Sequence, residues 1–220
     1  MIEPFHLNIT LPMTTSGQIR APVAIAFETG LVVLAAFLGW FFGRWPLPGV
    51  SFAADRWFEQ LVAVGWGVLA AIPMILLLLV IDRCPFGPWR SLQQTVDQRL
   101  LPMIRHWSIG DMVLISLAAG LGEEMLFRGL LQAGLIDWLP GTRGVVIGLI
   151  VASAVFGMCH WVSHAYAVLA GGMGLYLGVV LLMTENLLAP IVTHAVYDFA
   201  ALVYLLRYRP AKEGSPNQEA

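Results

Sequence analysis

Charged residues and cysteines are scarce in this chain. Only 12% of its 220 residues are Asp, Glu, Lys or Arg, the formal net charge is −2, and there are two cysteines. No long run of Lys and Arg offers a basic surface, so we expect no nucleic-acid partner. Cys84 ends one apolar segment and Cys159 lies within another, so we expect no disulfide. Residues 1–20 lack the basic start, apolar core and cleavage site of a signal peptide.

Apolar residues, in contrast, make up 58% of the sequence, and its mean hydropathy is +0.76. These values are typical of an integral membrane protein rather than a soluble domain. A membrane-spanning helix needs about 20 apolar residues. We therefore predict an all-α, polytopic transmembrane helix bundle with about six crossings, five or seven being the alternatives. The expected crossings are residues 21–43, 61–81, 111–138, 144–164, 166–183 and 187–206.

The chain is predicted to have three parts. Residues 1–110 comprise an N-terminal tail, two transmembrane helices and a polar connection, residues 111–206 form the motif-bearing core, and residues 207–220 form a polar tail. The first part carries no motif and is expected to supply only scaffold helices. Six crossings place both termini on one side together with eight Lys and Arg residues, against three on the other. By the positive-inside rule, both termini and the polar connection are cytoplasmic.

The third apolar run contains two adjacent glutamates and an arginine. Each charge at the centre of a membrane helix costs about 2.5–3.5 kcal/mol, so three within six residues indicate a function that requires them. Glu124 and Arg128 are four residues apart and can pair on one side of the helix. Glu123 is turned by about 100° and meets a different neighbour. This spacing predicts one structural and one reactive carboxylate. Ser108 and Asp111 predict a capping box at the start of this helix.

Two further polar clusters lie at membrane depth. The fourth run carries Phe156, His160 and His164, and the sixth carries His194 and Asp198 on one helix face. Ionisable groups on membrane helices turn inward and meet one another rather than lipid. We therefore expect side chains from three helices to converge on one cavity, namely Glu123, His160, His194 and Asp198.

The three motifs Glu-Glu-x-x-x-Arg, Phe-x-x-x-His and His-x-x-x-Asp, in this order on successive apolar segments, resemble those of the CPBP family. This family comprises the CAAX prenyl endopeptidases and bacterial Abi-type and bacteriocin-processing relatives. The resemblance covers about residues 111–206 and implies a CPBP-like catalytic core with peptidase activity. It implies that Glu123 is the catalytic glutamate and that His160 helps it to activate water.

The resemblance also assigns the remaining motif residues. His194 and residue 198 would stabilise the oxyanion, while Glu124 and Arg128 would support the site. Residue 198 is Asp here, whereas the prenyl endopeptidases have Asn. Because an ionised Asp repels an oxyanion, Asp198 would have to be protonated, orient His194 or bind a metal.

Alternative functions remain open from the sequence. The same side chains could bind zinc, because His160 and His164 are i and i+4 on one helix, and His194, Asp198 or Glu123 could complete the ligands. The His-Glu-x-x-His signature is absent, since residue 161 is Trp. A Cys159 nucleophile is disfavoured, because Cys159 and His160 point about 100° apart on a helix. A transporter or a non-catalytic membrane scaffold would also use buried carboxylates and histidines.

The partners follow from the resemblance only as a class. It implies a peptide or protein substrate presented at the lipid bilayer, without specifying a CAAX sequence, and a location in the bacterial cytoplasmic membrane. No cofactor is required, zinc being the alternative. The sequence does not define the oligomeric state.

Overall fold

The computed structural model describes residues 18–84, 87–139 and 141–209, and within these ranges the regular structure is helical apart from an isolated bridge residue. Residues 1–17 of the predicted N-terminal tail and residues 210–220 of the predicted C-terminal tail lie outside the described residues. Five helices are long and apolar enough to cross a membrane. The chain is thus an integral membrane protein with an all-helical fold. The five are α1 (Ala21–Phe41), α2 (Trp57–Arg83, preceded by the 3₁₀ turn Ala54–Arg56), α7 (Thr142–Cys159), α8 (His164–Thr184) and α9 (Leu188–Val203, continuing as a π-helix over Tyr204–Tyr208).

The glutamate segment is helical from Ile109 to Trp138 but consists of three parts. It begins as α5 (Ile109–Glu124), widens to a π-helix over Met125–Gln132 and ends as α6 (Ala133–Trp138). The predicted capping box is present at its start, where Ser108 and Asp111 bond each other's backbone N–H. At about 1.5 Å per residue this segment is about 45 Å long, enough for the sixth crossing that we predict.

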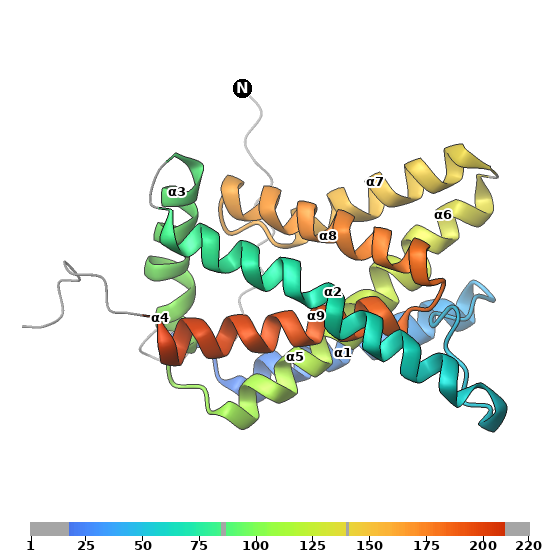
Figure 1. Ribbon diagram of the computed structural model, residues 1–220, viewed down its shortest axis with the longest axis horizontal. Coiled ribbons are helices and arrows are strands. Elements are labelled where there is room, and N and C mark those ends of the chain that lie inside the picture. Colours follow the sequence, from blue (N-terminus) through green and yellow to red (C-terminus); the bar gives the residue numbers. More distant parts are fainter. Residues whose placement is uncertain (1–17, 85–86, 140, 210–220) are drawn as a thin grey trace, which may run out of the picture.

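The long helices run roughly along one axis, and a shorter group lies across one end of the bundle (Figure 1). This group contains α3 (Pro88–Thr95), the π-helix Val96–Leu100 and α4 (Leu101–Ile104). Within the bundle, α5 packs between α1 and α9, α2 packs on α9, and α7 packs on α8. Two of the motif-bearing helices, α5 and α9, therefore have neighbours from both halves of the chain.

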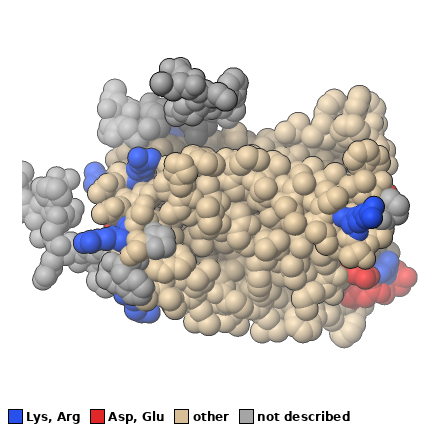
Figure 2. Space-filling view, turned by 90° about the horizontal axis from the view of Figure 1, so that it is seen from above, with Lys and Arg blue, Asp and Glu red and all other residues tan. Residues whose placement is uncertain are grey.

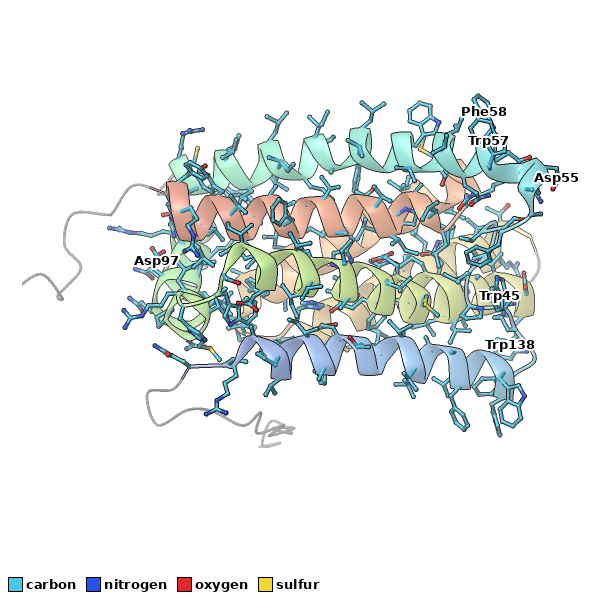
Figure 3. All side chains as sticks on the ribbon, turned by 90° about the horizontal axis from the view of Figure 1, so that it is seen from below. Trp45, Asp55, Trp57, Phe58, Asp97 and Trp138 are labelled. Carbon is cyan, nitrogen blue, oxygen red and sulfur yellow. The ribbon has the colours of Figure 1, made fainter. Side chains whose placement is uncertain are left out.

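The surface between the two ends of the bundle is apolar. Figure 2 shows Lys, Arg, Asp and Glu gathered at the ends with a wide uncharged band between them. Large apolar side chains of the long helices are exposed, among them Val68, Val168 and Met183. Trp45, Trp57 and Trp138 are spread across one end of the bundle, as in the aromatic belts of membrane proteins (Figure 3). Which end faces the cytoplasm stays a prediction from the arginine distribution.

One predicted boundary is wrong, and it affects the histidines. The fourth run was expected to be helical to residue 164, but α7 ends at Cys159 and His160 is its C-terminal cap. Ser163 then caps the N-terminus of α8 by accepting from Tyr166 N–H, and His164 is the first residue of α8. His160 and His164 therefore do not share a helix, so they lack the i, i+4 arrangement on one helix face that was proposed to bind zinc.

Small residues set the distances between the helices. This is usual in membrane proteins, because lipid provides no hydrophobic driving force between helices and their association depends on close packing. Gly67 of α2 lies against α9, and a Cβ added there would come within 2.6 Å of the Val192 side chain and 2.7 Å of the Ala189 carbonyl oxygen. Thr193 also donates to the Gly67 carbonyl at 3.0 Å. A side chain at position 67 would therefore separate α2 from α9.

We predict that Gly67→Ala lowers the thermal stability of the protein in detergent, because overpacking costs about 1–3 kcal/mol. Gly65 provides a matched control on the same helix, since a Cβ there would meet nothing within 4 Å. Gly65→Ala should leave the melting temperature unchanged or raise it, because Ala is the better helix former by about 1 kcal/mol. Equal melting temperatures for both variants would contradict the close α2–α9 contact.

Candidate active site

The side chains predicted to converge do so in one cavity. Its volume is about 380 Å³, and Glu123 of α5, His160 at the end of α7, and His194 and Asp198 of α9 all line it. A Glu123 carboxylate oxygen lies 3.6 Å from His160 Nε2, and the other lies 3.9 Å from His194 Nε2. His194 Nε2 is 3.4 Å from an Asp198 oxygen. The geometric prediction from the sequence is confirmed.

Glu124 points away from this cavity into a fully buried ion pair. Arg128 Nη1 donates to Glu124 Oε1 at 2.9 Å, and neither side chain is exposed to solvent. Arg128 Nη2 donates to the Gly174 carbonyl of α8 at 3.1 Å, and the guanidinium lies 4.4 Å from the centre of the Phe156 ring. The pairing predicted from the i, i+4 spacing is therefore present.

The same Glu124 oxygen also holds His194. It accepts from His194 Nδ1 at 2.8 Å, so that Arg128 and His194 share one carboxylate oxygen. A carboxylate is only an acceptor, so Nδ1 carries a hydrogen and Nε2 is the nitrogen that faces Glu123 and Asp198. The ion pair thereby fixes both the orientation of the imidazole and the nitrogen it presents to the cavity.

His160 is oriented by its own helix. Its Nδ1 lies 2.9 Å from the Phe156 carbonyl oxygen, which can only accept, so Nδ1 carries the hydrogen and Nε2 faces Glu123. The Phe156 ring stacks on the His160 ring with centroids 4.4 Å apart. Phe156 thus contacts both His160 and Arg128, a role that the motif did not reveal.

The turn after His160 is held from outside the motif-bearing core. Arg99 Nη1 donates to the Val162 carbonyl at 2.7 Å, and the Thr95 hydroxyl donates to the Ser163 hydroxyl at 3.0 Å. Glu28 of α1 also lines the cavity. Residues 1–110 therefore contribute Glu28 to the cavity and support the turn beside it, and their role as scaffold stays a prediction. The detectable signal was Glu28 itself, an ionisable residue within an apolar run.

The cavity residues do not form a metal-ligand set. Among residues 18–84, 87–139 and 141–209, no three His, Cys, Asp or Glu side chains are arranged to hold one metal ion. His164 is exposed and lies on a different helix from the residue it was expected to accompany. Cys84 and Cys159 are both free, and Cys159 is exposed rather than directed into the cavity as a nucleophile would be.

Comparison with known proteins places the motif-bearing region in a family. No curated protein and no solved structure matches the chain. Residues 105–200 match a family model described as "Type II CAAX prenyl endopeptidase Rce1-like". The matched range contains the three motifs and excludes α1 and α2. Residues 105–200 therefore form a domain of the Rce1-like type II CAAX prenyl endopeptidase family, and membership of this family implies a membrane protease.

Proposed function

We propose that the protein is an intramembrane endopeptidase that hydrolyses a peptide bond of a peptide or protein presented at the membrane. The observation that carries this proposal is the Glu123 carboxylate facing two imidazole Nε2 atoms, at 3.6 Å and 3.9 Å, inside a cavity. Both distances exceed a direct hydrogen bond. The adjoining cavity has room for a water molecule or a substrate oxygen that bridges these groups from the side.

Glu123 and His160 activate the water in this proposal. His160 carries its hydrogen on Nδ1, so a neutral ring offers Nε2 as an acceptor, and the Glu123 carboxylate is a second acceptor. A water in the cavity that bridges these two atoms directs both hydrogens at acceptors and its lone pairs at the substrate carbonyl carbon. Glu123 takes one proton as the oxygen attacks, and no covalent enzyme intermediate forms.

His194 stabilises the oxyanion that results. Its imidazole lies between the Glu124 carboxylate on Nδ1 and the Asp198 carboxylate on Nε2, an arrangement that favours hydrogens on both nitrogens. The Nε2–H group then donates to the developing negative charge, which such preorganised donors stabilise best in a water-poor site. Asp198 acts by supporting His194 in this scheme, so its own charge need not contact the oxyanion.

The substrate can be identified by comparing membrane peptides from cells that contain the wild-type protein with those from cells that contain Glu123→Gln. Peptide termini present only with the wild type mark the cleavage sites. A synthetic peptide spanning one such site then serves as the substrate for purified variants in detergent. An absence of wild-type-dependent termini, together with ion flux through reconstituted protein, would instead favour a transporter.

We predict that Glu123→Gln lowers the rate of peptide cleavage by about 100- to 10,000-fold, because the amide keeps the shape but cannot accept the proton. Peptide binding, measured by fluorescence anisotropy, should survive. Glu185→Gln makes the same chemical change at an exposed position between α8 and α9, outside the cavity, and should have no effect. A fully active Glu123→Gln enzyme would refute the assignment.

Asp198→Asn distinguishes support of His194 from metal binding. The Glu124 bond to Nδ1 orients His194 without Asp198, so we expect cleavage within about tenfold of wild type, since loss of a true general base or acid costs at least about 100-fold. Chelator treatment should leave both enzymes active. An inactive variant with reduced metal content, measured by mass spectrometry alongside a chelator-sensitive wild type, would establish a metalloprotease instead.

Arg128→Ala tests the structural role of the ion pair. Removing one partner of a buried pair typically costs about 3–5 kcal/mol because the other charge is stranded, so folded yield, melting temperature and activity should all fall. Arg44→Ala is the control, because the Arg44–Asp137 pair is partly exposed and such pairs contribute about 0–1 kcal/mol. Wild-type yield and stability with selective loss of activity would assign Arg128 a catalytic role.

A further inference from the structure

Glu28 lies beside the candidate active site but belongs to α1, outside the matched family domain. The backbone of α1 touches α5 at this point, since a Cβ added to Gly122 would come within 2.7 Å of the Glu28 carbonyl oxygen. Gly122 directly precedes Glu123. The absence of a side chain at Gly122 thus lets Glu28 approach the proposed general base, and the Glu28 carboxyl group lines the same cavity.

One oxygen of the half-buried Glu28 side chain is enclosed without a hydrogen bond to any residue that the structure describes. Its Oε2 atom is inaccessible to solvent and has no hydrogen-bond partner among the described residues. The groups that interact with it electrostatically are Glu123 of α5, His194 and Asp198 of α9, and His160 at the end of α7. Two of these four are carboxylates, and none is Lys or Arg.

The nearby arginines are already engaged. Arg128 is bonded to Glu124 and the Gly174 carbonyl. Arg209, which also lines the cavity, pairs with Asp82 at 2.6 Å and with Asp97. The two carboxylates among its neighbours outnumber the one imidazolium proposed above, that of His194, so a buried Glu28 carboxyl group is more stable when it is neutral. Glu28 is therefore suited to hold a proton next to Glu123.

Hydrolysis of an amide requires such a proton. The nitrogen of a peptide bond leaves as an amine, so it must be protonated as the carbon–nitrogen bond breaks. We propose that Glu28 is the general acid that protonates the leaving nitrogen, a proposal that rests on the endopeptidase function above. Water gives one proton to Glu123 and its oxygen bonds to the carbonyl carbon. The carbon–nitrogen bond then breaks as Glu28 gives its proton to nitrogen, and the proton on Glu123 returns Glu28 to the acid form.

The histidines are less suited to this step. A neutral His160 has its hydrogen on Nδ1, where the Phe156 carbonyl accepts it, and presents only an acceptor to the cavity. His194 is held by Glu124 and is directed at the oxyanion in the proposed mechanism. Glu28 approaches from α1, whereas the histidines belong to α7 and α9. The acid and the oxyanion donor thus come from different helices.

The test compares two leaving groups. The substrates are the synthetic cleavage-site peptide and its analogue with a thioester in place of the scissile amide, because a thiolate can leave without taking a proton. Glu28→Gln should lower kcat for the peptide by about 100-fold or more, with KM little changed. The same variant enzyme should cleave the thioester at close to the wild-type rate. Glu185→Gln should match the wild type on both substrates, and Glu123→Gln should be slow on both.

The remaining outcomes overturn the proposal. Equal losses on peptide and thioester would make Glu28 a positioning residue, a raised KM with unchanged kcat would make it a substrate-binding residue, and unchanged kinetics would give it no role. If Glu28→Gln does not fold, Glu28→Asp is the second variant, because it retains a carboxylic acid. Its ratio of peptide to thioester cleavage rates should stay within about tenfold of the wild-type ratio, whereas loss of the acid should change that ratio by about 100-fold or more. A larger change in that ratio, or failure of this variant to fold, counts against the proposal. An active Glu123→Gln enzyme would refute the endopeptidase mechanism separately.

Discussion

The buried contact of Arg128, Glu124 and His194 determines how the rest of the site is arranged. Removing an ion pair from water is costly, and the attraction of its partners offsets that cost only when further hydrogen bonds satisfy both. Here the Gly174 carbonyl and the Phe156 ring contact the guanidinium, while His194 donates to the shared carboxylate oxygen. Helices α7, α8 and α9 therefore all contact the charge pair of the glutamate segment. A shift of any of them would strand a charge in a water-poor interior.

Close helix contacts convert this arrangement into a reactive geometry. Arg128 reaches the backbone of α8 at a glycine, Gly174, and Gly120 of α5 packs so closely on α9 that a Cβ would lie 3.0 Å from the Ala195 side chain. Gly122 of α5 packs equally closely on the backbone of α1. Two glycines of α5, both within three residues before Glu123, thus allow α9 and α1 to approach α5 next to the reactive carboxylate. The spacing between carboxylates and imidazoles follows from backbone approach that larger residues would prevent.

The sequence predicted the elements that depend on local spacing and missed those that depend on tertiary contact. The i, i+4 relations of Glu124 with Arg128 and of His194 with Asp198 are properties of one helix, and both pairs are present. The end of α7 was missed because its apolar composition continues past Cys159, although Ser163 is a good helix cap and was a readable signal. The π-helix after Glu124 and the approach of Glu28 depend on packing between helices, which no local pattern encodes.

Adjacent glutamates with different surroundings explain how one short motif supplies both structure and chemistry. Glu124 Oε1 is occupied by Arg128 and His194, so this carboxylate has little capacity to bind substrate or water there. Glu123 is one residue away, yet its contacts with His160 and His194 are both longer than a hydrogen bond. Its lone pairs therefore remain available to a water molecule. Because the structural glutamate also orients the imidazole that faces the reactive one, a change at Glu124 alters the chemistry at Glu123 without touching it.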